Sequence, residues 1–294
     1  MEEHDLAQGL RSARYIPEAG LTTSLWLALS IGRPILLEGD AGVGKTAVAA
    51  ALAHALDRRL IRLQCYEGLD LQQAVYEWNY GRQLLAIRLH ERDAGGLAEE
   101  DLFAPSYLME RPLLSAILSK SPCVLLIDEI DRADEAFEAY LLEALADYQI
   151  TIPELGTLTA TAPPAVVLTS NGTRDLSDAL RRRCLYYFLD YPTLAREIEI
   201  VRTTLPHAEQ KLIEEAVEFV QRLRREELHK SPGIAETLDW MRALYRLNLK
   251  ALPEDPRTIL STLSCLLKTR EDRAHVTEEH ARQLLEGRKI SQHG

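Results

Sequence analysis

The stretch Gly39-Asp40-Ala41-Gly42-Val43-Gly44-Lys45-Thr46 matches the phosphate-binding pattern G-x-x-x-x-G-K-[ST]. The short apolar segment 34–38 before it predicts a buried parallel strand, and residues 47–56, rich in alanine and leucine, predict a helix. Strand, glycine-rich loop and helix is the order in which this pattern binds phosphate. A glycine-rich turn with a chance lysine is the alternative, and both flanking segments argue against it.

The residue types in this loop suit ATP held together with Mg²⁺. Backbone N–H groups and the start of the helix converge on the β- and γ-phosphates, and Gly42 and Gly44 leave room for that approach. We expect Lys45 to reach the β/γ oxygens as a point charge and the Thr46 hydroxyl to ligate Mg²⁺.

Composition limits the class of protein. The chain has 294 residues, 46% hydrophobic and 27% charged, as expected for a soluble globular protein with one sizeable domain and a smaller one. Its net charge of -11 argues against a diffuse nucleic-acid-binding face, although a local basic patch stays open. The acidic start and the lack of a long apolar run predict neither a signal peptide nor a membrane span.

The four cysteines are scattered without C-x-x-C pairing: Cys65, Cys123, Cys184 and Cys265. This spacing argues against a thiolate zinc site and a disulfide framework. We expect the cysteines beside predicted strands to be buried thiols, and we expect the protein to be cytoplasmic.

A second motif ends the apolar run 123–129, which predicts a central strand buried on both faces. Asp128 and Glu129 then emerge at the carboxyl end of the strand, where open α/β sheets place their ligands. We expect Asp128 to orient Mg²⁺ and its waters and Glu129 to polarise the attacking water. Solvated acids at a strand end are the alternative.

Two further candidates follow along the chain. Asn171 ends the predicted strand 165–171 and could bind the γ-phosphate or the attacking water, although Asn-Gly is also a common turn pair. Arg181, Arg182 and Arg183 end a predicted helix over 175–183. They could complement the helix dipole, but we favour a cation offered to a neighbouring subunit's γ-phosphate, with Arg182 and Arg183 ahead of Arg181.

The remaining pattern predicts two domains, residues 1–192 with five αβ units and residues 193–294, which are wholly helical. Within the first, residues 68–93 predict a helix interrupted at Gly81-Arg82, residues 94–110 an exposed excursion and residues 149–162 a β-hairpin. We expect Lys45 and Asp128 to follow adjacent strands, close enough to share one nucleotide and its Mg²⁺.

The order of these motifs resembles Walker A, Walker B, sensor 1 and arginine finger of AAA+ ATPases. That resemblance implies a P-loop NTPase fold, a parallel five-stranded αβα core with a C-terminal helical lid. The segments 37–39, 128–133 and 179–183 resemble the MoxR group, and 65–70, 77–80 and 231–240 are similar to its CoxD-like members. In many ring-forming P-loop ATPases a segment just before the first strand closes over the adenine, so the resemblance makes Tyr15 and Ile16 a candidate adenine wall. Ordinary packing of these two residues is the alternative.

The resemblance also implies partners. MoxR proteins resemble chaperones that form homo-oligomeric rings, usually hexamers, and insert metals or remodel clients alongside a von Willebrand A domain protein. CoxD-like members are linked to maturation of the molybdenum–copper site of carbon monoxide dehydrogenase. The family's insert in helix 2 and its hairpin before sensor 1 correspond to residues 70–93 and 149–162. Its sensor 2 arginine has no counterpart in 233–237, where Arg242 is a possible substitute.

The leading hypothesis is therefore a ring-forming AAA+ ATPase that remodels or matures a protein client and binds no nucleic acid. A nucleic-acid-directed motor or loader is one alternative, which the excess of acidic over basic residues disfavours. A scaffold that binds ATP without hydrolysing it is another, which the missing arginine keeps open.

Overall fold

The computed structural model describes residues 1–90 and 99–290, so part of the predicted helix 2 insert, residues 91–93, lies outside the described residues. The chain forms two compact units. The first is an α/β unit and consists of Met1–Gly9, Glu18–Glu38 and Thr46–Phe188. The second is mostly helical and consists of Leu10–Pro17, Gly39–Lys45 and Leu189–Gly294.

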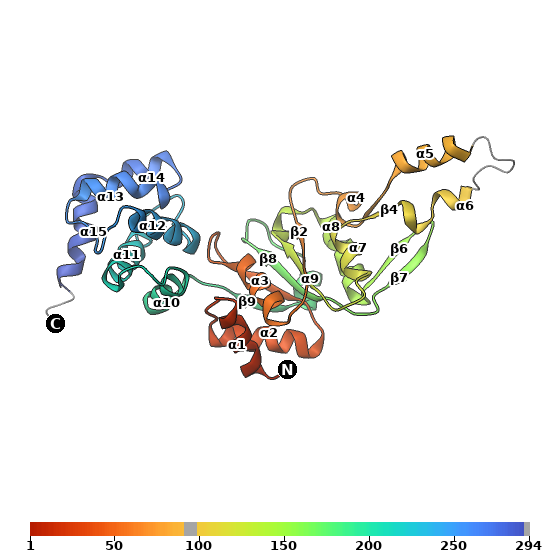
Figure 1. Ribbon diagram of the computed structural model, residues 1–294, viewed down its shortest axis with the longest axis horizontal. Helices are drawn as coiled ribbons and strands as arrows, with labels where there is room; N and C mark the ends of the chain where they lie inside the picture. The colour runs from red at the N-terminus through yellow and green to blue at the C-terminus, as the bar shows by residue number, and fades with distance from the viewer. Residues whose placement is uncertain (91–98, 291–294) are drawn as a thin grey trace. The chain divides into compact units, whose positions relative to one another are not determined.

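A five-stranded parallel sheet is the centre of the first unit (Figure 1). Its order is β2-β5-β8-β1-β9, with bounds Leu60–Gln64, Val124–Asp128, Ala165–Ser170, Ile35–Glu38 and Leu185–Phe188. The predicted P-loop NTPase fold class is confirmed. The expectation that Lys45 and Asp128 follow adjacent strands is wrong, because β8 lies between β1 and β5.

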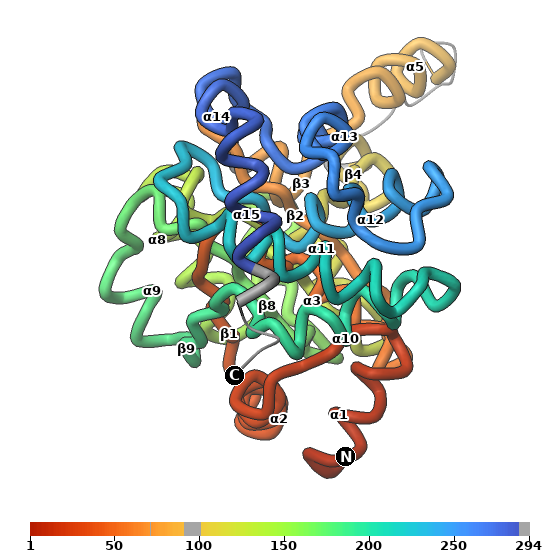
Figure 2. The backbone as a smooth tube through the Cα atoms, turned by 90° about the vertical axis from the view of Figure 1, so that its left-hand side faces the viewer, coloured from red at the N-terminus to blue at the C-terminus, as the bar shows by residue number. Residues whose placement is uncertain are grey.

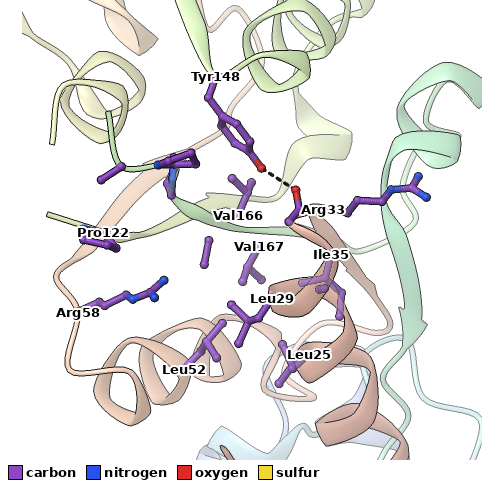
Figure 3. A pocket seen from close by; sticks show the side chains of 16 residues that line it. Leu25, Leu29, Arg33, Ile35, Leu52, Arg58, Pro122, Tyr148, Val166 and Val167 are labelled. Carbon is purple, nitrogen blue, oxygen red and sulfur yellow. Dashed lines mark hydrogen bonds between the residues drawn. The ribbon is translucent and has the colours of Figure 1, made fainter. Parts of the chain in front are cut away.

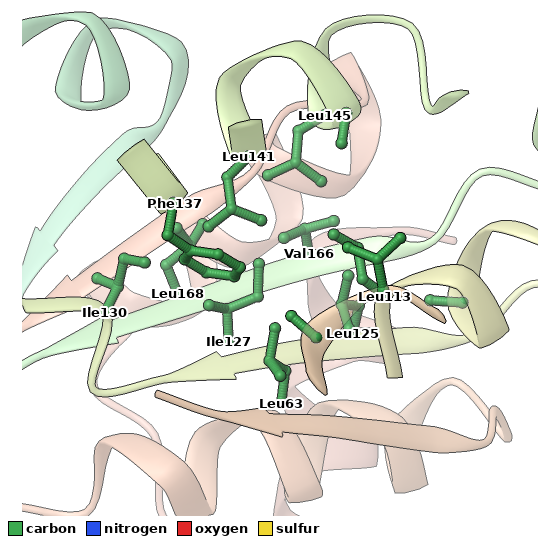
Figure 4. Packing of buried hydrophobic residues seen from close by; sticks show 14 of the residues in the cluster. Leu63, Leu113, Leu125, Ile127, Ile130, Phe137, Leu141, Leu145, Val166 and Leu168 are labelled. Atoms are coloured by element: carbon green, nitrogen blue, oxygen red, sulfur yellow. The ribbon is translucent and has the colours of Figure 1, made fainter. Parts of the chain in front are cut away.

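Apolar side chains hold the sheet to its covering helices. All five residues of β5 are buried, as a strand covered on both faces requires. Helix α8 (Glu135–Ala146) places Phe137, Leu141 and Leu145 at intervals of four residues, so that they share one face and pack on Ile127 and neighbouring strand residues (Figure 4). Helix α7 (Pro112–Ile117) joins the same core. The remaining long helices of this part of the chain are α1 (Glu3–Ser12), α2 (Ala19–Ile31) and α3 (Lys45–Ala55).

The predicted helix over 68–93 is wrong in its middle. The chain instead forms α4 (Leu71–Ala74), β3 (Tyr76–Trp78) and α5 (Tyr80–His90), with Gly81 inside α5. Residues 99–110, expected as an excursion, contain α6 (Glu99–Leu102), a 3-10 turn and β4 (Leu108–Glu110), which pairs antiparallel with β3. Trp78 explains the strand, because it is buried and its ring packs edge-on against Phe103 at 5.3 Å.

The predicted hairpin is confirmed as β6 (Gln149–Ile152) and β7 (Gly156–Thr159). Ile150 and Ile152 are buried, while the facing β7 is mostly exposed. The alternating pattern of the sequence thus reflects a hairpin that packs with one strand only. A short helix, α9 (Asp178–Arg183), leads into β9.

The second unit contains the helices that follow β9 (Figure 2). They are α10 (Leu194–Thr204), α11 (Gln210–Leu223), α12 (Ile234–Arg246), α13 (Pro256–Thr262), α14 (Arg270–His275) and α15 (Glu278–Ile290). Phe219 and Trp240 pack ring to ring at 5.2 Å in the core, and the indole N–H of Trp240 donates to Thr262 Oγ1 at 2.8 Å.

The cysteines behave as expected from their positions. All four are free thiols, and Cys65, Cys123 and Cys184 are buried. Burial raises the pKa of Cys184 to about 12, which makes this thiol inert. Within the described ranges, no helix combines the length and apolar character needed to cross a membrane.

Candidate functional site

The two predicted magnesium ligands meet at the carboxyl edge of the sheet. Asp128 is the last residue of β5, and its side chain is only 4% exposed. Thr46, the second residue of α3, points its hydroxyl at this carboxylate, with 3.1 Å to Oδ1 and 3.2 Å to Oδ2. Thr46 and Asp128 therefore meet although β8 lies between β1 and β5, and strand adjacency is not needed.

Thr169, near the end of β8, orients both acidic residues. Its hydroxyl donates to Asp128 Oδ1 at 2.5 Å and accepts the backbone N–H of Glu129 at 2.9 Å. Thr169 is fully buried, so these bonds are not replaced by water. Thr169 is not among the residues predicted from the sequence, although a polar residue at the end of an apolar strand beside β5 is a usable signal.

Glu129 has a strained backbone and a tethered carboxylate. Its φ of 56° and ψ of 51° lie in the left-handed region, which costs a non-glycine residue roughly 1–3 kcal/mol. Its Oε2 accepts from Gln64 Nε2 at 3.1 Å and Arg132 Nη1 at 3.3 Å, while the side chain stays 33% exposed. Such strain is typical of functional positions, and the partial exposure leaves the carboxylate accessible to water.

Arg62 on β2 supplies a cation to the buried aspartate. Its Nη2 lies 2.6 Å from Asp128 Oδ2, while the arginine side chain is 52% exposed. Arg62 and Gln64 stand two residues apart on one strand face, so both reach the acidic residues at the end of β5. Neither residue is among those predicted from the sequence. Their alternation with the buried Ile61 and Leu63 is the signal that could have identified them.

Negative charge concentrates at this edge. Burial first, and then the charges of Asp128, Asp131 and Glu129, raise the pKa of Cys65 to about 12. A divalent cation would relieve this field, and its oxygen donors, a hydroxyl and a carboxylate, are the ligands that Mg²⁺ prefers. The residues therefore fit the predicted ion.

Asp131 anchors the segment that carries Asn171. Its Oδ2 accepts the N–H groups of Asn171 at 3.2 Å and Thr173 at 3.0 Å and the Thr173 hydroxyl at 2.6 Å. Burial alone would raise the pKa of Asp131, but these hydrogen bonds outweigh it and hold the pKa below its usual value. The side-chain amide of Asn171, half-buried, makes no hydrogen bond with any residue that the structure describes.

The phosphate-binding loop, in the second unit, has the backbone that its glycines allow. Gly42 and Gly44 have φ values of 84° and 103°, which side chains disfavour. Lys45 Nζ donates to the carbonyls of Gly39 at 2.6 Å and Asp40 at 2.7 Å, so the lysine is held by its own loop. Asp40 and Ala41 are exposed and Val43 is buried.

Helix α12 begins against this loop. The Ile234 N–H donates to the Gly42 carbonyl at 2.9 Å, and a Cβ on Gly233 would lie 2.6 Å from both Gly42 Cα and its carbonyl oxygen. A side chain at position 233 is thereby excluded in this arrangement, which accounts for the glycine at the start of α12. Arg242, the possible substitute, is half exposed and pairs with Asp239 at 2.8 Å.

The predicted adenine wall is packed within the second unit. Ile16 is buried, and its carbonyl accepts from Arg196 Nε at 3.1 Å and Nη2 at 2.9 Å. Tyr15 is half-buried, and its N–H donates to the Leu10 carbonyl. These contacts explain the two residues as packing, and a contact with adenine stays a prediction.

The three arginines at the end of α9 differ in their engagement. Arg181 pairs with Glu38 at 3.1 Å, and Arg183 donates to the carbonyl of Leu142. Arg182 is exposed, and its guanidinium makes no hydrogen bond or ion pair with any described residue. Arg33 fixes the backbone beneath it by donating to the carbonyls of Arg182 and Arg183.

A separate cavity lies at the opposite, amino-terminal edge of the sheet (Figure 3). It has a volume of about 360 Å³ and is lined mainly by apolar side chains such as Leu25, Leu29 and Val167, with Arg33 and Arg58 among them. The motif residues 39–46, 128 and 129 are not part of its lining. We therefore place the functional site at the carboxyl edge.

A known family covers the part of the chain that carries these motifs. Residues 34–184, just over half of the chain, match the family described as AAA domain (dynein-related subfamily). The chain belongs to this AAA family. The matched AAA region begins before the phosphate-binding loop and ends after the arginines of α9, so it contains all the motif residues except Tyr15 and Ile16.

The chain is also similar to individual proteins. The denitrification regulatory protein NirQ of Stutzerimonas stutzeri is 26% identical, covering 70% of this chain and 69% of that protein. An uncharacterized protein of Staphylococcus aureus is 26% identical, covering 74% and 77%. A point mutant of Thermotoga maritima RuvB superposes with a TM-score of 0.50 at 20% identity, covering 95% of this chain and 73% of that one, which shows a common fold.

Proposed function

We propose that this AAA protein is a Mg²⁺-dependent ATPase of the MoxR group, which uses ATP hydrolysis in a homo-oligomeric ring to remodel or mature a client protein. The observation that carries the proposal is the meeting of the Thr46 hydroxyl with the Asp128 carboxylate at 3.1 Å, directly beside the strained Glu129. A hydroxyl, a buried acid and an accessible acid supply metal ligation and base catalysis in one place.

The residues divide the chemistry between them. Thr46 and Asp128 would hold Mg²⁺, which when bound neutralises charge on the phosphates. Lys45 exchanges the carbonyls of Gly39 and Asp40 for phosphate oxygens, which its flexible stem and three donors allow. Arg62, half exposed, turns away from Asp128 at the same time.

Glu129 acts on the attacking water. Its carboxylate accepts the water proton as the water oxygen attacks the γ-phosphorus, the bond to the β,γ-bridging oxygen breaks and ADP leaves with that oxygen. Gln64 and Arg132 keep the carboxylate in position. Thr169 fixes the Glu129 backbone, so the base and the Asp128 ligand keep a constant separation. The Asn171 amide, held through Asp131, is available to orient the same water or the γ-phosphate.

Arg182 is our choice for the arginine finger, because Arg181 and Arg183 are already engaged within the chain. Its exposure suits a contact in trans, and the Arg33 bonds to the carbonyls beneath it give it a rigid base. This role requires a ring, and a hexamer is the form we propose.

Replacing Glu129 by Gln tests the proposal. The variant should bind Mg²⁺–ATP as the wild type does and hydrolyse it ~10²–10⁴-fold more slowly, because only the base is lost. Glu135→Gln, which changes an exposed acid at the start of α8, should leave both unchanged. An unchanged single-turnover rate in Glu129→Gln would remove Glu129 from the mechanism.

The ring and the finger have their own test. Arg182→Ala should abolish most hydrolysis when present in every subunit, while mixing it with Lys45→Ala subunits should restore part of the rate. The restoration arises because some interfaces then combine an intact loop with an intact arginine. Full activity of a monodisperse monomer would contradict the assignment.

We propose the two-domain division predicted from the sequence, residues 1–192 and 193–294. We also propose that the ATPase is cytoplasmic and that its helix 2 insert and its β6–β7 hairpin face a client. The match to a denitrification regulatory protein fits a regulatory role. A von Willebrand A domain protein and a metalloenzyme client are the partners we expect, in line with the CoxD-like resemblance. Cross-linking of the native complex followed by mass spectrometry tests both.

A scaffold that binds ATP without hydrolysing it is the second candidate. Gly233 favours it, because this position lies in the stretch that matches the sensor 2 arginine and its contact with Gly42 leaves no room for an arginine side chain. Tight ATP binding with no product in a single-turnover assay would decide for it. Hydrolysis that Glu129→Gln removes would decide for the enzyme.

A further inference from the structure

Three metal-ligating side chains converge in the second unit, outside every motif discussed above. Glu226 lies just after α11, His275 ends α14, and His280 lies in the first turn of α15. One ligand atom from each lies within 4.8 Å of the other two. Helices α14 and α15 follow one another along the chain (Figure 2), and the rings of His275 and His280 lie edge to face at 5.2 Å.

The closest pair already has the spacing of a metal site. His280 Nε2 lies 3.3 Å from Glu226 Oε2. Two ligands of a tetrahedral zinc ion, each bound at about 2.0–2.1 Å, stand about 3.3 Å apart. The ring of His275 packs edge-on against that of His280 at 5.2 Å. Because His275 is exposed, its side chain can rotate to become the third ligand.

The second nitrogen of His280 is placed to select the correct tautomer. Its Nδ1 faces the carbonyl oxygen of His275 at 3.4 Å. A proton on Nδ1 is donated to that carbonyl and leaves the Nε2 lone pair directed at Glu226. Metal-binding histidines characteristically donate their other ring N–H in this way, which orients the ring.

The backbone that carries the three ligands is fixed independently. Asp272 of α14 accepts the N–H groups of His229 at 2.8 Å and Lys230 at 3.1 Å, and so ties the segment after Glu226 to α14. Thr277 caps α15 by accepting the His280 N–H at 3.2 Å. The ligands therefore belong to one scaffold, and binding requires only side-chain adjustment.

We propose that Glu226, His275 and His280 form a binding site for a divalent transition metal ion, with Zn²⁺ as the best fit. Two imidazoles and one carboxylate suit zinc, whereas Mg²⁺ and Ca²⁺ prefer oxygen donors alone. Three protein ligands leave a fourth position for water or for a side chain of a bound protein. The cysteine spacing excludes only a thiolate site, and this site uses no cysteine.

Zinc titration of the tag-free, chelator-treated full chain tests the site. We expect one zinc equivalent by calorimetry and an intense Co²⁺ visible spectrum when cobalt replaces zinc. His280→Ala and His275→Ala should each weaken zinc binding at least ~100-fold, because removing even an outer-shell partner costs 10–100-fold. His207→Ala, an exposed histidine of the same unit, is the matched control and should bind as the wild type does.

Glu226→Gln guards against misfolding, because the amide keeps the shape and removes only the charged ligand. It should retain the wild-type circular dichroism and lose affinity, and zinc should raise the melting temperature of the wild type but not of His280→Ala. Zinc that stays bound to a His275→Ala/His280→Ala double variant would overturn the proposal. The proposal would also be overturned if the wild type bound zinc no more tightly than that double variant. Glu226 and His280 would then form only an ion pair.

Discussion

Two buried carboxylates, one in each unit, pair with arginine in different ways. Asp128 receives a single contact at 2.6 Å from Arg62, whose side chain is 52% exposed. Glu197 of α10 receives two contacts, at 2.6 and 2.7 Å, from Arg224, whose side chain is 7% exposed. The first cation can leave for solvent, and the second cannot.

The surroundings of the second pair complete the contrast. Glu197 also accepts from Gln221 at 2.6 Å and Thr237 at 2.8 Å, and Arg224 donates to the Pro232 carbonyl and lies over the Tyr191 ring at 4.9 Å. All three guanidinium nitrogens of Arg224 and both carboxylate oxygens of Glu197 have protein partners, so the network fixes the segment before α12. Burial of a carboxylate therefore does not mark a functional site; an exchangeable partner does.

The largest stability effect should come from breaking the fixed pair. Arg224→Ala leaves Glu197 charged and buried without its partner, which we expect to cost about 3–5 kcal/mol of unfolding free energy. Urea denaturation of the purified protein measures this. A loss no greater than that of Arg62→Ala would erase the distinction between the two pairs.

Thr169→Val should have the next largest effect, because it removes the hydroxyl that joins Asp128 to Glu129. The Glu129 N–H and an Asp128 oxygen lose a buried partner, at a cost of about 1–3 kcal/mol. Hydrolysis should fall with it, while ATP binding persists. Thr151→Val, on the exposed face of β6, is the control. Wild-type hydrolysis in Thr169→Val would show that the two acids need no common support.

Arg62→Ala tests the exchangeable ion pair between Arg62 and Asp128. A half-exposed ion pair contributes little, so unfolding free energy should change by less than about 1 kcal/mol. Half-maximal ATP hydrolysis should need less Mg²⁺, because no guanidinium competes for Asp128. A higher Mg²⁺ requirement would mean that Arg62 contacts the nucleotide directly.

The smallest effect concerns pH. The folded-state pKa of Asp131 lies below the value of about 3.9 for an unfolded aspartate, so its hydrogen bonds stabilise the fold above that pH. This contribution is lost as the pH falls through the folded-state pKa. Asp131→Asn should be less stable near neutrality and lose less on acidification below about pH 4, as monitored by urea midpoints. Parallel curves for the two proteins would contradict the linkage.

The fold was largely predictable because its parts are local. The phosphate-binding pattern predicts a loop between a strand and a helix from neighbouring residues alone. The apolar run that ends in Asp128-Glu129 predicts a buried strand in the same way. The β6–β7 hairpin follows from alternation around a single turn. The strand pair β3–β4 was missed because Trp78 and Leu108 are thirty residues apart, and neither strand is stable without the other.

Only the site residues that belong to a sequence motif were predictable. Thr169, Arg62 and Gln64 touch the motif acids from β8 and β2, and their role depends on the strand order. That order places β8 between β1 and β5. The motifs along the chain do not reveal this strand order. The glycine at position 233 likewise has its reason in a contact with Gly42 that is distant in sequence.

The most direct test of the central claim is the position of the metal in crystals grown with a non-hydrolysable ATP analogue and Mn²⁺. We predict an anomalous scattering peak at the Thr46 hydroxyl and the Asp128 carboxylate, with the triphosphate over residues 39–46. A peak that lies away from both side chains, or a triphosphate outside this loop, would contradict the account.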